Sequence, residues 1–259
     1  MEDPYVFAEH FAFSLPASIN LVGGGGKTGL ILELLSEYAP ATRVLYTTTT
    51  RMHPPHPSDG LVILSSDHED LLQLLLERAV ACECRERKFV ATRLQCAPGL
   101  LRGVGPAFAA RLDACAFPLI LNEADGARSM SLKMPRDNEP VLMRGAGYLV
   151  PVIGLDCLNR PAGPDCLFRW EIARERCGLK PGETLTPDLA AAVLLHPMGV
   201  CRDWRPGMRI IPFINKADTA AEDAPAHDLA QALLRNAHFP IERVVIGSVQ
   251  QHRAASLYP

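Results

Sequence analysis

The sequence lacks the signatures of several common protein classes. None of its eight cysteines forms a C-x-x-C pair, and their spacing matches no zinc module. It contains no run of about eighteen uncharged apolar residues, so we expect no transmembrane helix. Neither sign of charge dominates, since the formal net charge is −3. No basic patch indicates binding to nucleic acid or to a membrane surface.

The first residues do not show the pattern of a secretory signal. The chain begins Met1-Glu2-Asp3, which is acidic, and no apolar segment of the required kind follows. We therefore expect a cytoplasmic protein with reduced thiols. The closest cysteines are Cys82 and Cys84, which we interpret as two thiols near a helix end rather than as a soft-metal site.

Short apolar runs alternate with helical patterns along the 259 residues. The strands predicted from these runs cover residues 19–22, 43–47, 61–64, 89–91, 117–122, 148–153, 210–214 and 244–246. One predicted helix follows the first strand and ends near residue 38. The other predicted helices cover residues 71–76, 107–114, 186–195 and 228–234. This alternation predicts an α/β fold with a mostly parallel sheet and helices on both faces. We expect a single domain over 1–259, with the segment 160–187, rich in proline, glycine and charge, as an inserted subdomain or lid.

The most informative stretch is a strand, a glycine turn and a helix over residues 19–38. It reads I-N-L-V-G-G-G-G-K-T, and the four glycines are Gly23, Gly24, Gly25 and Gly26. A glycine loop before a helix N-terminus can point amide groups at phosphate, which predicts a P-loop NTPase-like domain. Lys27 would contact the β- and γ-phosphates, and the Thr28 hydroxyl would ligate Mg²⁺. The first glycine of the full motif is replaced by Leu21.

An acidic pair follows a later buried strand. Glu123 and Asp125 stand at the end of the run over 117–122, and Gly126 comes next. Ligands of open α/β sheets lie outside the carboxyl ends of the strands. One carboxylate would hold Mg²⁺, and the other would orient the attacking water or sense the γ-phosphate. We assign neither role to one residue. Gly126 would offer its amide to the phosphate.

A third motif, N-K-x-D, follows the run over 210–214. It consists of Asn215, Lys216, Ala217 and Asp218. In this motif the aspartate accepts from the N1–H and N2–H₂ groups of guanine, the lysine stem packs across the base and the asparagine fixes the loop. The pattern therefore predicts GTP as the nucleotide, with ATP as the alternative. A capped turn is the simpler interpretation of the same residues.

Weaker candidates lie near the same strand ends. Thr49, Thr50 and Arg51 follow the strand over 43–47, where they would reach Mg²⁺ or phosphate. His53 and His56 flank prolines in the next loop, and we interpret them as solvent-exposed rather than metal-binding.

Two basic residues follow the acidic pair. Arg128 and Lys133 would neutralise phosphate or a second anionic substrate such as a pterin cofactor, unless they belong to a solvated basic loop.

Together these motifs resemble the YqeC family, described as accessory proteins of selenium-dependent molybdenum hydroxylases. The matching positions are 25–28, 47–51, 123–128, 133, 135, 139–140, 152–156, 169, 194–197 and 215–218. Phe168 and Trp170 depart from the usual His-Arg-Pro-Glu stretch of the family. The resemblance implies a nucleotide-binding maturation factor for a molybdenum enzyme.

Three functions follow from these residues and the resemblance. The first is a Mg²⁺-dependent nucleotide hydrolase, GTP preferred, acting through Lys27, Glu123 and Asp125 as a maturation factor for a selenium-dependent molybdenum hydroxylase. The second is a small-molecule kinase or nucleotidyltransferase, whose molybdenum-cofactor-type substrate is held by Arg128, Lys133 and Arg169. In the third, the nucleotide only locks a partner-binding shape. The sequence leaves the client, the acceptor and the oligomeric state open.

Overall fold

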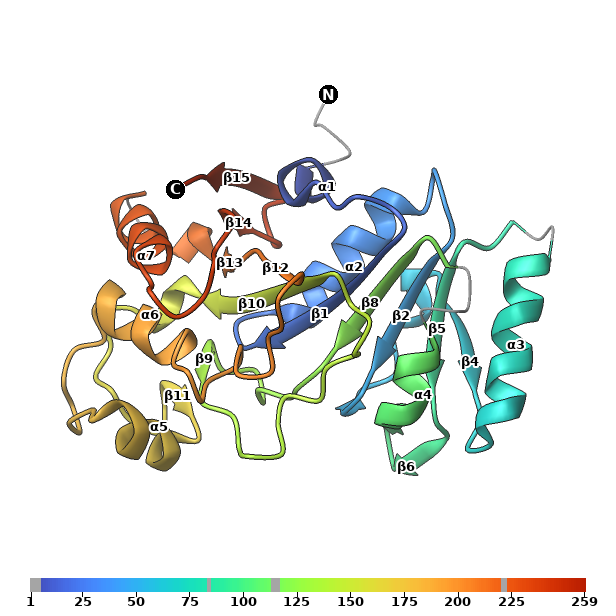
Figure 1. Cartoon of the computed structure of the whole chain (residues 1–259), viewed down its shortest axis with the longest axis horizontal. Helices are drawn as coiled ribbons and strands as arrows, with labels where there is room; N and C mark the ends of the chain where they lie inside the picture. The colour runs from blue at the N-terminus through green and yellow to red at the C-terminus, as the bar shows by residue number, and fades with distance from the viewer. Residues whose placement is uncertain (1–5, 83–84, 113–116, 220–222) are drawn as a thin grey trace.

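The structure is a computed structural model that describes residues 6–82, 85–112, 117–219 and 223–259. It is an α/β fold with a large, mostly parallel sheet of ten strands flanked by helices, as predicted (Figure 1). Cys84 and the end of the helix predicted over 107–114 lie outside the described residues. No helix in the described ranges has the length and apolar character needed to cross a membrane.

The regular elements alternate along the chain. The helices are α1 (Val6–Phe11), α2 (Lys27–Tyr38), α3 (Glu69–Ala81), α4 (Pro106–Arg111), α5 (Trp170–Cys177), α6 (Pro187–Leu194) and α7 (Ala224–Leu234). The strands of the large sheet are β1 (Ala17–Gly23), β2 (Val44–Thr48), β4 (Val62–Ser65), β5 (Lys88–Thr92), β8 (Leu119–Glu123), β10 (Tyr148–Gly154), β12 (Arg209–Ile210), β13 (Phe213–Asn215), β14 (Val244–Ser248) and β15 (Arg253–Leu257). Two small sheets pair β9 (Leu132–Lys133) with β11 (Leu167–Phe168) and join β3 (Arg51–Met52), β7 (Leu100–Arg102) and β6 (Gln95–Ala97).

Strand β1 lies in the middle of the large sheet. The order is β15-β14-β13-β10-β1-β8-β2-β5-β4, and β12 also pairs with β10. Both neighbours of β1 run parallel to it, and the pair β14–β15 is antiparallel. The carboxyl ends of β2, β8, β1, β10 and β13 therefore meet along one edge of the sheet, where a ligand site is expected.

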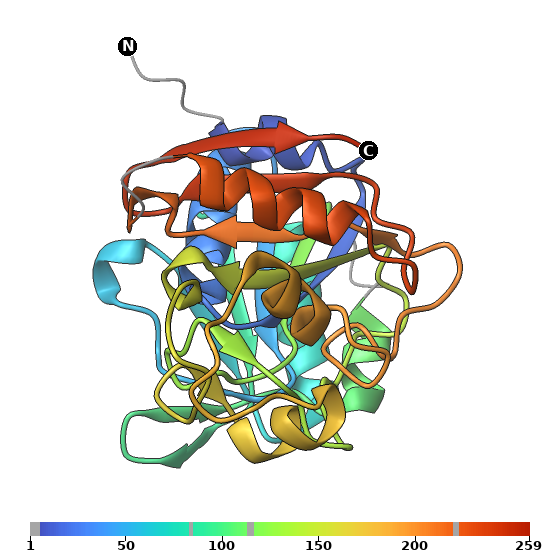
Figure 2. The ribbon, with the colours of Figure 1, turned by 90° about the vertical axis from the view of Figure 1, so that its left-hand side faces the viewer.

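The sheet is covered on both faces because successive side chains of a strand point to opposite sides. In β1, Ile19 and Leu21 pack into the cluster that holds α1 and α2, whereas Val22 packs into the opposite one. Helices α5, α6 and α7 cover that opposite face beside β10, β13 and β14 (Figure 2). Helices α3 and α4 cover it beside β2 and β5. Both faces are thus apolar, as the continuous hydrophobic runs indicated.

Two features of the sheet differ from the prediction. The single strand predicted over 210–214 is divided into β12 and β13, because Pro212 has no N–H to donate to a ladder. The antiparallel edge strand β15 was missed, since its residues are a mixture of charged, small and apolar ones.

The segment 160–187 packs into the main core. Ala162, Leu167 and Trp170 all belong to the large apolar cluster under β10 and β13. Strand β11 in this segment also pairs with β9, so the segment contributes to the body of the fold around the strand ends.

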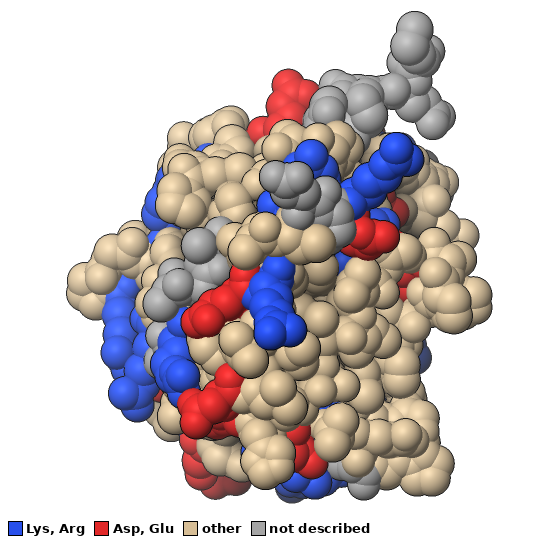
Figure 3. All heavy atoms as spheres, turned by 90° about the vertical axis from the view of Figure 1, so that its right-hand side faces the viewer, with Lys and Arg blue, Asp and Glu red and all other residues tan. Residues whose placement is uncertain are grey.

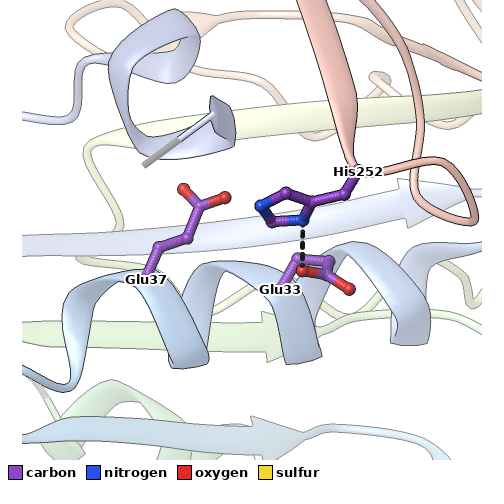
Figure 4. Close-up of side chains that lie close together, drawn as sticks. All are labelled: Glu33, Glu37 and His252. Carbon is purple, nitrogen blue, oxygen red and sulfur yellow. Dashed lines mark hydrogen bonds and ion pairs between the residues drawn. The ribbon is translucent and has the colours of Figure 1, made fainter. Parts of the chain in front are cut away.

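Two glutamates of α2 contact α1 and the turn before β15 (Figure 4). The carboxylate of Glu37 accepts hydrogen bonds from the amides of Phe7 (3.0 Å) and Ala8 (2.5 Å), at the first turn of α1. The carboxylate of Glu33 accepts from Nδ1 of His252 over 3.0 Å, and the imidazole ring lies between the two glutamates. Each of the three offers one atom within 4.8 Å of the others, but Glu37 already caps α1. We interpret Glu33, Glu37 and His252 as a cluster that stabilises the packing of these elements rather than as a metal site.

On the face formed around α3 and β4, acidic and basic side chains are interspersed among uncharged ones (Figure 3). Leu71 and Leu74 of α3 are exposed there.

Candidate functional site

The predicted glycine turn and the predicted acidic pair lie next to each other. The Thr28 hydroxyl donates to Glu123 Oε2 over 3.0 Å, and Lys27 Nζ lies 3.2 Å from Asp125 Oδ1. Lys27 and Thr28 begin α2, directly after the glycine turn that follows β1, and the acidic pair stands at the end of β8, the parallel neighbour of β1. The topology therefore brings together residues that are about a hundred positions apart.

Close packing and backbone conformation both require the glycines of the turn. Gly23, Gly25 and Gly26 have φ angles of 93°, 79° and 115°, a region that residues with a Cβ rarely adopt. A Cβ on Gly25 would lie 2.2 Å from the amide nitrogen of Gly154. A Cβ on Gly24 would lie 2.4 Å from the carbonyl oxygen of Met130. The turn is thus pressed against the end of β10 and the loop before β9.

That packing occupies three of the amides that were predicted to cradle phosphate. The amide of Gly23 donates to both oxygens of Asp125 at 3.1 Å. The amides of Gly24 and Gly25 donate to the carbonyls of residues 152 and 130 at 2.9 Å. Gly23, Gly24 and Gly25 are buried, whereas Gly26 and Thr28 are exposed.

The amides at the start of α2 remain available. Within the described residues no acceptor is recorded for the N–H groups of Gly26, Lys27 and Thr28. The first-turn amides of a helix have no partner inside the helix, and the helix dipole favours an anion there. An anion bound at this turn would therefore meet residues 26–28, and the inner glycines would support the loop.

Asp125 is the buried centre of a charge network. Its side chain is 0% exposed, and it accepts from Lys27 at 3.2 Å and from Lys133 at 3.0 Å, whose side chains are 3% and 0% exposed. Lys27 Nζ also donates to the carbonyl of Gly23 over 2.5 Å. A buried carboxylate is costly unless it is paired and hydrogen-bonded. This network therefore fixes the glycine turn to the acidic loop.

Lys133 connects Asp125 to a second carboxylate, that of Glu139. Its ammonium group donates to the carbonyl of Gly126 (2.8 Å) and to Glu139 (3.2 Å). Arg169 holds Glu139 in a bidentate ion pair. Burial raises the pKa of Glu139, but the hydrogen bond from Arg169 and the charge of Lys133 outweigh it and leave the pKa below its usual value.

The three basic residues predicted for a second substrate gather around one aromatic ring. The guanidinium carbons of Arg169 and Arg128 lie 4.9 and 5.6 Å from the centroid of Phe168, and Lys133 Nζ lies 5.9 Å from it. Such distances allow cation–π attraction. Phe168 is one of the positions at which the sequence departs from the family pattern, and nothing in its spacing indicated this role.

Glu123 is the more accessible of the two acidic residues. Its side chain is 13% exposed, and it accepts from the Tyr46 hydroxyl (2.8 Å) as well as from Thr28. Burial, followed by the charge of Glu123, raises the pKa of Tyr46 well above its usual value. Tyr46 therefore stays a hydrogen-bond donor. The oxygens of Thr28 and Glu123 are of the hard type that Mg²⁺ prefers.

The threonines after β2 hold the loops around the acidic pair. The Thr49 hydroxyl donates to the carbonyl of Val141 over 2.6 Å, and the amide of Thr50 donates to the hydroxyl of Thr48 over 3.1 Å. The hydroxyl of Thr48 in turn donates to the carbonyl of Glu123 over 2.8 Å. Thr49 and Thr50 thus lie beside the candidate site.

The two histidines that follow lie in loops, as interpreted from the sequence. Nδ1 of His53 is 3.0 Å from the carbonyl of Gly99, and Nδ1 of His56 is 2.7 Å from the hydroxyl of Ser58. Both histidines are exposed.

The N-K-x-D motif joins three loops at the end of β13. Asn215 Nδ2 donates to the carbonyl of Gly25 over 2.8 Å, and its Oδ1 accepts from the amide of Val249 at 3.1 Å. Lys216 is paired with Asp156 at 2.8 Å. Asp218 Oδ1 is buried and has no hydrogen-bond partner in the described part of the chain, from which the adjacent residues 220–222 are left out.

A buried asparagine pair was missed by the sequence analysis. Asn20 and Asn122 lie opposite each other on β1 and β8, and Asn122 Nδ2 donates to Asn20 Oδ1 over 2.8 Å. Asn20 also binds the backbone of Met143 through both side-chain atoms. A polar residue in the middle of a fully buried strand needs partners, so Asn20 and Asn122 were a usable signal for a loop docked on the sheet.

The fold and the site together define an α/β protein consistent with a P-loop NTPase-like fold. A family model described as YqeC protein matches residues 19–171. A protein of Escherichia coli (strain K12) named "Uncharacterized protein YqeC" is 30% identical over 243 residues, which cover 92% of this chain and 90% of the relative. The chain belongs to the YqeC family.

Proposed function

We propose that this protein binds a Mg²⁺–nucleoside triphosphate, with GTP preferred over ATP, and hydrolyses it as a maturation factor for a selenium-dependent molybdenum hydroxylase. The observation that carries the proposal is the position of the α2 N-terminus. The amides of Gly26, Lys27 and Thr28 have no acceptor among the described residues, and the Thr28 hydroxyl of the same turn contacts the carboxylate of Glu123. Amide donors for phosphate and oxygen ligands for a divalent cation are thus next to each other.

The residues present fit a magnesium ion. Thr28 Oγ1 and Glu123 Oε2 are 3.0 Å apart, and both are oxygen ligands open to one side of the glycine turn. Asp125 is saturated by two lysines and one amide. Glu123 therefore fits the metal better than Asp125 does. When bound, the ion would neutralise charge on the phosphates.

Lys27 connects nucleotide binding to the acidic loop. To contact a phosphate its ammonium group has to leave Asp125 and the carbonyl of Gly23, which hold it in this structure. Asp125 would then keep Lys133 as its remaining ion-pair partner. The Lys133–Glu139–Arg169 chain would respond to that change, which gives a route from the nucleotide to the loop over residues 126–140.

The guanine preference rests on Asp218. Its buried Oδ1, which has no partner among the described residues, is an acceptor just after β13, where Asn215 already ties the loop to the glycine turn. Guanine N1–H and N2–H₂ would satisfy that acceptor, whereas adenine does not offer both. The maturation role rests on family membership alone.

The test is a calorimetric titration of the full chain with Mg²⁺–GTP and Mg²⁺–ATP, together with an assay for phosphate release. We expect Lys27→Ala to weaken triphosphate binding by about tenfold or more. Lys180→Ala removes an exposed lysine and should change nothing. Asp218→Asn should weaken GTP binding selectively. Equal affinity of the wild type for GTP and ATP would contradict the guanine assignment.

A kinase or nucleotidyltransferase is the second candidate. Arg128 favours it, because this arginine is exposed and lies over the ring of Phe168 beside the acidic loop, whereas Lys133 and Arg169 are already paired with carboxylates. It predicts slow hydrolysis alone and fast turnover with an acceptor such as a molybdopterin-type compound. A purely binding module, by contrast, predicts that folded Asp125→Ala still supports maturation of the client enzyme. Circular dichroism checks the fold of this variant, because Asp125 is also a buried ion-pair partner.

A further inference from the structure

A cavity of about 280 Å³ is lined in part by Asn138 and Pro140, the neighbours of Glu139 in the chain. Residues of the segments 138–144 and 202–208 form its walls, and Pro106 of α4 closes one side. None of these residues belongs to the glycine turn, the acidic pair or the N-K-x-D motif. The cavity is therefore separate from the nucleotide site proposed above.

The cavity has an excess of positive charge. Arg144, Arg202 and Arg205 line it, against a single acid, Asp203. Arg202 is engaged, since it donates to the carbonyls of residues 136 and 137. For the guanidinium groups of Arg144 and Arg205 no ion pair or hydrogen bond is found within the described ranges. Arginine in this state is suited to binding carboxylate or phosphate oxygens in a forked geometry.

Apart from Asn138, the rest of the lining is apolar. Met143 and Met208 are buried, at 0% and 7% exposure, and Leu142 packs against the main core. A cavity with an apolar lining and a few charged groups binds ligands that combine an apolar body with an ionic group. Two arginines without a partner among the described residues, beside two methionines, thus point to an organic anion.

The wall of the cavity is attached to the strand ends that carry the acidic pair. The amide of Val141 donates to the carbonyl of Ala124 at 3.1 Å, and Ala124 directly precedes Asp125. The carbonyl of Val141 accepts from the Thr49 hydroxyl at 2.6 Å. Any ligand that moves the segment 138–144 therefore acts on residues adjacent to the proposed phosphate site.

We propose that this cavity binds a small organic anion with an apolar or aromatic body, recognised by Arg144 and Arg205. Binding itself is independent of the nucleotide. The role of the anion, as the second ligand of the nucleotide-driven reaction, rests on the proposed function. Phosphate and carboxylate are the two anionic groups that the arginines would accept.

The test uses the full chain and three probes: phenyl phosphate, benzoate and neutral phenol. By calorimetry we expect at least one of the two anions to bind and phenol not to bind. Arg144→Gln and Arg205→Gln should each weaken the affinity by about tenfold or more. Arg253→Gln removes the same charge from the exposed edge strand β15 and should leave the affinity unchanged.

Trp204 supplies a local signal. It lies between cavity-lining Asp203 and Arg205, and the chain contains only two tryptophans. Binding in the cavity should shift tryptophan emission, and the shift should disappear in Trp204→Phe while calorimetric binding persists. Anion binding that is unaffected by both arginine variants would overturn the proposal, as would a wild type that binds neither anion.

A parallel titration with Mg²⁺–GTP keeps the two proposals apart. Intact anion binding without nucleotide binding would contradict the proposed function and leave the cavity assignment standing. Intact nucleotide binding without binding of either anion would contradict the cavity assignment and leave the proposed function standing.

Discussion

The side-chain amide of Asn215 donates a hydrogen bond to the carbonyl oxygen of Gly25 across 2.8 Å and 190 residues. The same side chain accepts from the amide of Val249. A single buried asparagine therefore holds the glycine turn after β1 and the loop after β14 against the end of β13. The N-K-x-D pattern predicts that the asparagine fixes the loop, and these two hydrogen bonds are the contacts through which Asn215 would do so.

Asn215→Ala should loosen the glycine turn. Two hydrogen bonds are lost, and two buried backbone groups are left without partners, which costs about 2–4 kcal/mol of unfolding free energy. Triphosphate affinity should fall as well, because the turn is no longer held in place. Urea denaturation and calorimetry measure the two effects. Asn236→Ala is the control, since Asn236 is half-buried and its side chain accepts a local hydrogen bond from the His238 amide at 2.9 Å; a loss of equal size there would contradict the interpretation.

Asp125→Asn should destabilise the protein strongly while keeping the shape of the side chain. Lys27 and Lys133 would lose their shared buried counter-ion, and an unpaired buried charge typically costs about 3–5 kcal/mol. Denaturant unfolding gives the measurement. Lys133→Met in the Asp125→Asn background should recover part of the loss, because it removes one of the stranded charges. No recovery in the double variant would show that the ion pair is not the cause.

Gly25→Ala should destabilise the fold by about 2 kcal/mol or more, because alanine resists a φ of +79° and its Cβ would lie 2.2 Å from the amide of Gly154. Gly163→Ala is the matched control, since nothing lies within 4 Å of a Cβ at that position. Thermal unfolding of both variants decides the matter. Equal melting temperatures of the two variants would contradict the conclusion that the turn is closely packed around Gly25.

The stability of the protein should decrease as the pH falls below about 4.5, the ordinary pKa of a glutamate. The pKa of Glu139 is lowered in the folded state, so the unfolded chain binds more protons in the window between the folded pKa and 4.5. The stabilisation is complete above this window and is lost within it. In Glu139→Gln the curve of unfolding free energy against pH should be shallower below 4.5.

A second carboxylate serves as the comparison for that pH profile. The hydrogen bond from Arg209 lowers the pKa of Glu242 against the opposing effect of burial. Glu242→Gln should therefore remove its own share of the acid dependence and leave that of Glu139. A Glu139→Gln profile parallel to the wild type throughout would contradict the assignment.

Local sequence determined much of this protein. The strand, glycine turn and helix over residues 19–38 are contiguous, so spacing and residue type alone predicted β1, the turn and α2. The carboxyl-terminal position of Glu123 and Asp125 after a buried strand followed in the same way. Alternation of strands and helices was enough to predict a parallel sheet, and parallel strands align their ends. These conclusions required no contact between distant residues.

Only the tertiary structure decided which groups at that edge are free to act. The amides of Gly24 and Gly25 are occupied by the carbonyls of Val152 and Met130, and Lys133 shares Asp125 with Lys27. Each of these contacts depends on how separate segments pack against one another. Because a sequence motif specifies residue types but not their long-range partners, it could name the candidate phosphate loop. It could not say that, among the described residues, the inner amides of the loop have acceptors and the last ones have none.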